Sequence, residues 1–251
     1  MRVFRGRAET VDADRAVTER LLESAADGER AVRVWHPHRQ VAFGRRDASL
    51  EGYERAREAA REAGFPPVER SVGGRAVAYD GETTIAFARA EPVADFRRGT
   101  DERYERLTAD VERALRGLGA DPATDGRPIR LERGEPPDSF CPGTHSLSTV
   151  DPDGRRRKVA GVAQRVRSDA ALVSGVLVVD NRRELAAALE AVYGALEVPL
   201  DPETVGSVAD GDGVADGSSR ASDPAAIREA LENALVGPDV DPESVTVEPV
   251  H

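Results

Sequence analysis

The sequence predicts an α+β fold, in which mixed or antiparallel sheets are flanked by helices. Three observations support this class. Strand-like runs stand in neighbouring groups that suit antiparallel pairing, amphipathic helical segments separate these groups, and no repeat divides the 251 residues. This length suits one large domain with a small appendage.

The first half of the chain alternates helical segments with short apolar runs. Apolar residues at helical spacing predict helices over residues 12–26, 49–63 and 101–118. Five runs are typical of strands, and the last three of them are consecutive: "AVRVWH", "QVAFG", "PVERSV", "GGRAVAY" and "TTIAFARA".

The second half begins with further strands around a turn-rich loop. The runs "PIRLE" and "LSTV" predict strands on either side of "RGEPPDSFCPGTHS". Residues 154–167 and "ALVSGVLVV" predict two more strands, and a helix is expected over 183–193.

The last part of the chain differs in composition. Residues 207–223, "SVADGDGVADGSSRASD", are typical of a flexible linker. The sequence therefore predicts a main domain over 1–206 and a short tail over 224–251, with a helix at 224–235 and a strand in "SVTVE". We expect a chain shortened from Asp210 onward to keep its chemistry.

Charge and composition restrict the classes of function. A formal charge of -11 argues against general nucleic-acid binding, which needs a basic surface. No apolar run approaches the ~20 residues of a membrane span, and the N-terminus lacks a signal-peptide h-region, so we expect a cytoplasmic protein without a membrane partner. The excess of acids, with 34 arginines and one lysine, indicates an acidic, halophile-like or GC-rich source. One cysteine and four scattered histidines predict no metal site.

The only lysine, Lys158, stands in "GRRRKVAGVAQRVR". If this run is extended, alternation places Lys158 on one face with Ala160, Val162, Gln164 and Val166. An unpaired ammonium on such a face is costly, so the lysine either reaches solvent from an edge strand or holds a carbonyl or oxyanion. Because arginine provides the other positive charges, the second interpretation is favoured, and a compact ammonium suits that role better than a planar guanidinium.

Cys141 stands in the loop "SFCPG". A free cysteine is usually buried and inert. Against this, Pro-Gly marks a turn, and loops carry chemistry more often than cores do. A cation beside a thiol makes thiolate available near neutral pH, and a loop with a hairpin could close the 17 residues between Cys141 and Lys158.

The segment "ERSVGGRAVAYD" places Gly73 and Gly74 between two strand-like halves. A Gly-Gly pair readily makes a hairpin turn. It also lets the chain of a ligand lie against bare backbone. Both interpretations stay open on this motif alone.

Taken together, "GGRAVAYD", "SFCPGTHSLS" and "RKVAGVAQRV" resemble the motifs of the biotin/lipoate protein ligase and lipoyl/octanoyl transferase superfamily, over roughly Val34–Gly206. The cysteine loop looks most like the amidotransferase branch, which moves an octanoyl group from the glycine cleavage H protein to dehydrogenase E2 subunits. The resemblance implies the biotin/lipoate-ligase catalytic fold for residues 1–206, transfer without a cofactor, and lipoyl-domain proteins as partners.

The resemblance also implies roles for single residues. Cys141 would carry the acyl group as a thioester, and Lys158 would hold its carbonyl oxygen. His145 could act as a base but is more often a solvated residue, and the run 155–157 could dock an acidic lipoyl domain or form a solvated hairpin. The implied substrate-binding residues, some of them one wall of an acyl slot, are Arg70, Gly73, Gly74, Arg75, Ala76, Val77, Gly161 and Gln164.

The chain departs from the family motifs at four places. Glu69 replaces an arginine, Tyr79 a histidine, His145-Ser146 an aromatic residue and an Asp, and Ser174-Gly175 a His-Gly pair. None of these changes removes the thiol or the ammonium. They leave the acyl specificity, octanoyl or lipoyl, and the acyl donor open.

Two other functions stay open. The first is an ATP-dependent lipoate ligase, which needs ATP and Mg; there Lys158 contacts the carboxylate and the acyl-adenylate, and Cys141 is incidental. The second is a non-catalytic acyl-binding or regulatory module that keeps the pocket without turnover.

Overall fold

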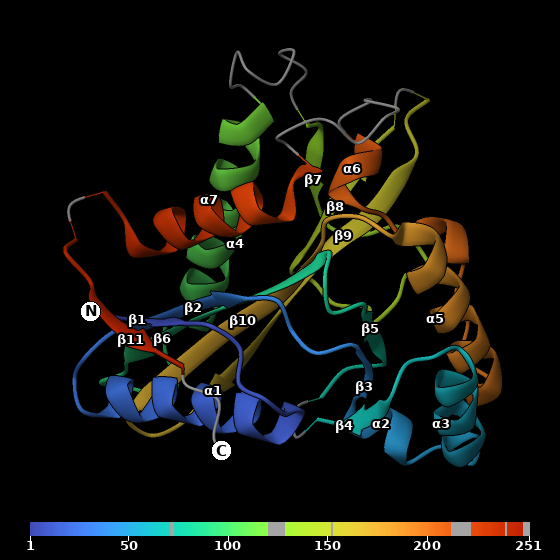
Figure 1. Cartoon of the computed structure of the whole chain (residues 1–251), viewed down its shortest axis with the longest axis horizontal. Helices are drawn as coiled ribbons and strands as arrows, with labels where there is room; N and C mark the ends of the chain where they lie inside the picture. The colour runs from blue at the N-terminus through green and yellow to red at the C-terminus, as the bar shows by residue number, and fades with distance from the viewer. Residues whose placement is uncertain (71–72, 120–128, 152, 212–221, 239, 248–251) are drawn as a thin grey trace.

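The computed structural model describes residues 1–70, 73–119, 129–151, 153–211, 222–238 and 240–247. Its largest element is an eight-stranded sheet (Figure 1). In spatial order, the strands are β11 (Glu243–Thr246), β1 (Arg2–Arg5), β2 (Ala31–Trp35), β6 (Thr84–Pro92), β10 (Ala170–Val178), β9 (Arg156–Val166), β8 (Ser146–Val150) and β7 (Leu131–Arg133).

The large sheet is mixed. β1 pairs in parallel with β2 and β11, whereas the pairs from β2 to β7 are antiparallel. The α+β class and the mixed sheet predicted from the sequence are confirmed. The N-terminal strand β1 was not predicted, because its four residues, "RVFR", place two apolar residues between two arginines and are too few for a clear pattern.

A second sheet of three strands stands beside the first, in the order β4 (Pro67–Glu69), β3 (Gln40–Phe43) and β5 (Val77–Tyr79). The three consecutive strands predicted in this region are β4, β5 and β6, but they are divided between the two sheets. β4 and β5 flank β3 rather than each other, and the next strand, β6, belongs to the large sheet. The predicted strand residues 71–72 lie outside the described residues.

Helices cover both faces of the large sheet and the outside of the small one (Figure 1). α1 (Val11–Ala26) packs on one face, and α4 (Thr100–Gly119) with α7 (Pro224–Val236) on the other. α3 (Tyr53–Glu62) and α5 (Arg182–Leu196) pack on the small sheet, and the short elements are α2 (Arg45–Ala48), η2 (Pro202–Thr204) and α6 (Val208–Gly211).

Local sequence explains where these helices begin. Thr10 caps α1 by accepting a hydrogen bond from the backbone N–H of Ala13. Asp223 caps α7 in the same way through Ala225, with Pro224 at the first helical position, where a missing N–H costs nothing. The predicted helix over 49–63 begins later, because a turn separates α2 from α3.

The tail belongs to the same hydrophobic core as the rest of the sheet. The predicted helix is α7, and its Ile227, Leu231 and Leu235 are buried against α4 and β2. The predicted strand is β11, which pairs with β1. Truncation from Asp210 would remove α7 and β11 and uncover this core. That such a truncation spares the chemistry stays a prediction. Within the predicted linker, α6 and residues 222–223 are described, whereas residues 212–221 lie outside the described residues.

A β-bulge in β9 sets the direction of the only lysine. Ser148 pairs with Lys158 and Leu147 pairs with Ala160, so Val159 is an extra residue. Neighbouring residues of β8 point to opposite faces, and so Lys158 and Ala160 do as well. The single face predicted for Lys158, Ala160 and Gln164 is wrong: the bulge turns Lys158 toward the small sheet.

Among the described residues, none of the helices combines the length and the apolar character needed to span a lipid bilayer.

Candidate active site

Cys141 lies in the loop between β7 and β8, where this loop reaches the small sheet. Its backbone has φ 41°, a left-handed conformation that a non-glycine residue adopts at a cost of about 1–3 kcal/mol. The preceding Phe140, only 2% exposed, anchors the loop in the core. Cys141 as a residue is half-buried. The fold therefore holds it with a strained backbone at the margin of the core.

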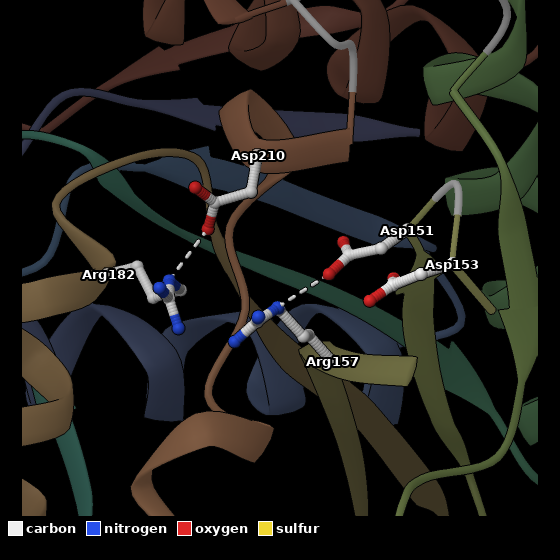
Figure 2. A pocket seen from close by; sticks show the side chains of 5 residues that line it. All are labelled: Asp151, Asp153, Arg157, Arg182 and Asp210. Atoms are coloured by element: carbon white, nitrogen blue, oxygen red, sulfur yellow. Dashed lines mark hydrogen bonds and ion pairs between the residues drawn. The ribbon is translucent and has the colours of Figure 1, made fainter. Parts of the chain in front are cut away.

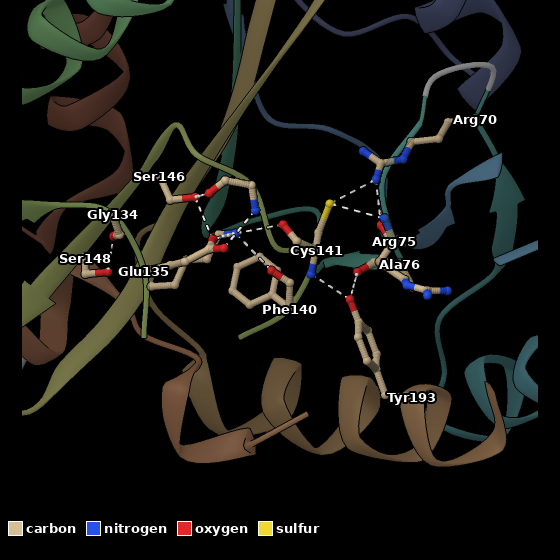
Figure 3. A network of polar contacts seen from close by, with 12 residues as sticks. Arg70, Arg75, Ala76, Gly134, Glu135, Phe140, Cys141, Ser146, Ser148 and Tyr193 are labelled. Carbon is tan, nitrogen blue, oxygen red and sulfur yellow. Dashed lines mark hydrogen bonds and ion pairs between the residues drawn. The ribbon is translucent and has the colours of Figure 1, made fainter. Parts of the chain in front are cut away.

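Two N–H donors converge on the sulfur (Figure 3). Sγ of Cys141 lies 3.3 Å from Nη2 of Arg70 and 3.4 Å from the backbone N of Arg75, and both groups donate to it. Nη2 of Arg70 also donates to the carbonyl oxygen of Arg75 at 2.6 Å, which fixes the guanidinium beside the thiol. The sulfur therefore accepts one hydrogen bond from a charged donor and one from a neutral backbone donor.

Arg70 remains a cation at this position. Burial acts to lower the pKa of Arg70, but its interactions with Tyr79 and Cys141 outweigh burial and raise the pKa above its ordinary value. Burial raises the pKa of Tyr79 and keeps the phenol neutral. The guanidinium therefore supplies the positive charge next to the thiol.

Gly74 makes room for the sulfur. Its φ is +95°, and a Cβ there would lie 2.9 Å from Sγ of Cys141 and 2.8 Å from Nη2 of Arg70. Gly44, between β3 and α2, packs even more closely, because a Cβ there would lie 2.1 Å from the carbonyl oxygen of Gly74. Gly73 has no atom within 4 Å of the corresponding position. Of the two predicted glycines, Gly74 is the one that contacts the thiol.

Tyr193 of α5 ties the two loops together. Its hydroxyl accepts a hydrogen bond from the N–H of Cys141 at 2.7 Å and donates one to the carbonyl oxygen of Ala76 at 3.0 Å (Figure 3). Tyr193 is 1% exposed, and burial raises its pKa, so the hydroxyl keeps its proton. Sequence analysis missed this residue, because a single Tyr on an amphipathic helix carries no functional pattern.

Lys158 lies under the same loop from the opposite side. Its side chain is 1% exposed, and Nζ donates to Oε2 of Glu135 at 2.6 Å and to the carbonyl oxygens of Phe140 and Cys141 at 2.9 and 2.8 Å. The interpretation of Lys158 as a solvent-reaching lysine is therefore wrong. The structure brings Lys158 and Cys141 together, with the ammonium on the backbone of the cysteine.

Glu135 is a second residue of the site that sequence analysis missed. Besides Lys158, it accepts hydrogen bonds at 2.8 Å from the N–H of Gly143 and from the hydroxyl of Ser146. No motif marks Glu135 in the sequence. The signal that could have found it is the lone lysine, because a buried ammonium needs a carboxylate nearby. Glu135 is an acid of the loop that also contains Cys141.

Some predicted substrate-binding residues lie beside the thiol and others do not. Arg70, Gly74 and Arg75 contact Cys141, and Ala76 is linked to it through Tyr193. Gly161 lies beside Lys158: a Cβ added at Gly161 would be 3.4 Å from Cε of Lys158. Val77 is buried in the core cluster that includes the small sheet. Gln164 accepts a hydrogen bond from Nε of Arg103 on α4 at 2.6 Å, on the other side of the large sheet from Lys158.

His145 and the arginine run also have structural partners. The ring of His145 stacks on Tyr104 with centroids 3.9 Å apart, and no contact joins it to the sulfur. Arg157 is buried and bonded to Asp151 and Glu203, whereas Arg155 is exposed. The predicted docking surface over 155–157 therefore keeps fewer free charges than the sequence suggests.

Arg157 lines a cavity of about 320 Å³ together with Asp151, Asp153, Arg182 and Asp210 (Figure 2), and Cys141 is not among the lining residues. Ion pairs cross it: Arg157 to Asp151 at 3.1 Å, and Arg182 to Asp210 at 3.0 Å. These charges satisfy one another, so the cavity is held by an internal ion-pair network. Within the described parts of the chain, no group of three or more His, Cys, Asp or Glu side chains could hold a metal ion.

The family follows from a comparison with known sequences. A model of the lipoyl protein ligase A/B catalytic domain matches residues 12–209, most of the chain. The chain belongs to this family. The predicted membership in the lipoate ligase and octanoyl transferase superfamily is thereby confirmed, and Cys141 and Lys158 both lie within the matched range.

Curated relatives carry transferase names. The chain is 30% identical over 155 residues to an octanoyl-[GcvH]:protein N-octanoyltransferase of Bacillus velezensis, covering 60% of this chain and 48% of the relative. It is 30% identical over 168 residues to the octanoyltransferase LipM of an Exiguobacterium strain, covering 64% and 59%. The chain thus spans about half the length of the curated relatives it matches.

Solved structures share the fold at low sequence identity. The lipoate-protein ligase A structure with bound ATP superposes with a TM-score of 0.68 at 18% identity, covering 98% of this chain and 89% of that one. The Thermoplasma acidophilum protein Ta0514, a putative lipoate protein ligase with bound lipoic acid, gives 0.67 at 18%, covering 98% and 88%. These similarities confirm the lipoate-ligase fold that the sequence predicted.

Proposed function

We propose that this protein transfers an octanoyl or lipoyl group to a lysine of lipoyl-domain proteins through a thioester on Cys141. One observation carries the proposal: the sulfur of a half-buried loop residue with positive φ accepts hydrogen bonds from a buried guanidinium and a backbone N–H. A structural cysteine needs neither the strained backbone nor the converging donors. The names of the curated relatives support the same reaction.

In the first step, the thiolate attacks the acyl carbonyl carbon of the donor. A bond forms between Sγ and that carbon, the bond to the donor's nitrogen or sulfur breaks, and the leaving group takes up a proton. Arg70 and the N–H of Arg75 already face Sγ, so they are placed to donate hydrogen bonds to the carbonyl oxygen and stabilise the negative charge that develops on it. Removing one such donor typically costs about 2.7–4 kcal/mol of transition-state stabilisation.

In the second step, the acceptor lysine attacks the acyl-cysteine. A C–N bond forms, the C–S bond breaks, the lysine nitrogen releases a proton to solvent, and the thiolate of Cys141 is restored. The same two donors serve both steps, because both pass through an oxyanion on the carbon attached to Sγ. Of residues 73–77, which we propose as one wall of the acyl slot, Gly74 and Arg75 contact the sulfur.

The proposal also covers the protein partners, the requirement for ATP and the location of the protein. The glycine cleavage H protein and E2 subunits are the expected lipoyl-domain partners, in line with the GcvH in the names of relatives and with a Thermoplasma acidophilum ligase solved in a study that includes its E2 lipoyl domain. The transfer itself uses no ATP, because the acyl bond of the donor is exchanged, through the thioester, for the amide bond of the acceptor. A cytoplasmic location stays a prediction.

The test compares the purified wild type with Cys141→Ser in transfer of an octanoyl group from an octanoylated H protein to an E2 lipoyl domain. We expect transfer by the wild type without ATP and a loss of at least 100-fold in the variant, the order expected when a nucleophile is removed. Transfer by Cys141→Ser at the wild-type rate would refute the proposal. In that case, lipoate-dependent exchange between ATP and pyrophosphate would identify a ligase, and octanoate binding without either activity a binding module.

A further inference from the structure

We infer that Glu135 is a positioning residue, which with Lys158 holds the loop of Cys141 in its reactive conformation. The inference rests on the proposed function, since it concerns the nucleophile of that reaction. It gives Lys158 a second role beside the expected contact with the acyl group, namely a contact with the protein's own backbone.

The contacts of the pair enclose Cys141 on both sides along the chain. Before and at the cysteine, Lys158 binds the carbonyl oxygens of residues 140 and 141. After it, Glu135 binds the N–H of Gly143 and the hydroxyl of Ser146. The Lys158–Glu135 ion pair at 2.6 Å joins the two halves. Together they hold a loop whose central residue has an unfavourable φ of 41°.

In this second role, the ammonium uses every donor that it has. A lysine has three N–H donors, and all three of Lys158 are used within the protein. At 1% exposure, exchanging one of them for a substrate oxygen would leave a buried carbonyl or Glu135 without its partner, which is costly. The donors that do face the thiol belong to Arg70 and Arg75.

This geometry also explains why the chain keeps one lysine here. The three acceptors of Lys158 surround a single small group, which a tetrahedral ammonium can serve and a planar guanidinium fork cannot. Gly161 lies beside the ammonium, where a Cβ would be 3.7 Å from Nζ. A larger cation would need space that the backbone of the bulged strand occupies.

Alkylation of Cys141 by iodoacetamide separates three roles, because this reagent offers no acyl carbonyl to hold. If the pair positions the loop, Glu135→Gln and Lys158→Met both slow alkylation. If the pair acts only through its charges, the two variants change the rate in opposite directions, since one removes a negative and the other a positive charge. If Lys158 acts only on the acyl group, neither variant changes the rate.

We expect alkylation at least tenfold slower in both variants. With S-octanoyl-N-acetylcysteamine as the acyl donor, we expect a similar fall in kcat of Cys141 acylation and a KM within twofold of the wild type. A loss of folded protein would also lower the apparent kcat at an unchanged KM. Each rate is therefore divided by the concentration of reactive thiol, measured by active-site titration. Glu132→Gln is the matched control: Glu132 is an exposed acid of β7 paired with Arg156, and this variant should stay within twofold.

Breaking a buried ion pair can unfold a protein, so a double variant keeps the inference testable. Glu135→Gln/Lys158→Met leaves no unpaired buried charge, and we expect a Tm above that of Lys158→Met with alkylation still at least tenfold slow. Opposite signs in the single variants, or wild-type alkylation in all three, would overturn the inference. If Cys141→Ser still transfers octanoyl groups, the proposed function has failed; if only the Glu135 and Lys158 results fail, the nucleophile stands and its positioning does not.

Discussion

At the scale of single residues, the site depends on which atom lies next to the sulfur. Cys141 receives a guanidinium N–H and a backbone N–H, and its own carbonyl is held by the only lysine. The backbone N–H is available because Gly74, just before Arg75, has no side chain in the way. The chemistry therefore depends on a missing Cβ as much as on the charged groups.

The two neighbouring glycines give a matched test of this statement. Gly74→Ala would place a Cβ 2.9 Å from Sγ at a φ of +95°, so we expect displacement of the thiol, alkylation of Cys141 at least tenfold slower, and a loss of stability of about 1–2 kcal/mol. Gly73→Ala is the control, because no atom lies within 4 Å of its Cβ position. Thiol alkylation and urea unfolding measure both; equal effects of the two substitutions would contradict the prediction.

Sequence alone identified Cys141, Lys158, Arg70 and Gly74 as candidates, and the structure brings these four residues together. It did not identify Glu135 or Tyr193. Their roles arise from contacts between elements far apart in the chain, such as the 52 residues between Cys141 and Tyr193. A local pattern carries no information on such contacts.

At the scale of elements, periodicity located the longer segments well. The predicted helix over 101–118 is α4 (Thr100–Gly119), because a strong apolar stripe over five turns is unambiguous. The bulge in β9 was not predictable, since no glycine or proline marks Val159 and an extra residue is defined only by the pairing with β8. That single residue decides which face of the sheet the lysine serves.

The turn between β5 and β6 fixes the start of the large sheet's central strand. The carboxylate of Asp80 accepts hydrogen bonds from the N–H groups of Glu82, Thr83 and Thr84 at 3.0, 2.9 and 2.9 Å. Burial alone would raise the pKa of Asp80, but hydrogen bonds from Thr83, Glu82 and Thr84 outweigh burial and lower the pKa below its ordinary value. The turn is therefore stabilised by the ionised carboxylate.

We expect Asp80→Ala to lower the free energy of unfolding at pH 7 by about 1.5–3 kcal/mol, the range for hydrogen bonds to a charged group. Because the folded pKa is depressed, this contribution is fully present above the unfolded pKa of about 3.9 and is lost as the pH falls through the folded value. The difference in free energy of unfolding between the wild type and Asp80→Ala, measured by urea unfolding, should shrink on acidification. Glu82→Ala, an exposed side chain of the same turn, should change little, and a difference that grows toward low pH would contradict the prediction.

At the scale of the whole molecule, the two ends of the chain close one edge of the sheet together. β11 pairs with β1, and α7 covers the face that α4 also covers (Figure 1). The sequence predicted the helix and the strand of the tail but not their attachment, because β1 was missed and a short amphipathic helix does not show what it packs against. The loop of Cys141 and the tail thus depend on the same large sheet.

We expect Leu231→Ala in α7 to destabilise the protein by about 2–5 kcal/mol, the usual cost of truncating a buried leucine. Leu231 is fully buried in the cluster that also contains Val159 and Leu147 of the strands around the cysteine loop. Thermal unfolding should show one transition at lower temperature, since the tail shares the main core. Glu229→Ala, an exposed residue of the same helix, is the control. A separate early transition with the main one unchanged would show an independent tail.

The most direct measurement is the intact mass of the protein after incubation with an octanoylated H protein and no ATP. The account predicts a mass increase of one octanoyl group, located on Cys141, removed by hydroxylamine, and discharged onto an added E2 lipoyl domain. An acyl group found only on another residue, or transfer to the lipoyl domain without any acyl-enzyme on Cys141, would contradict it.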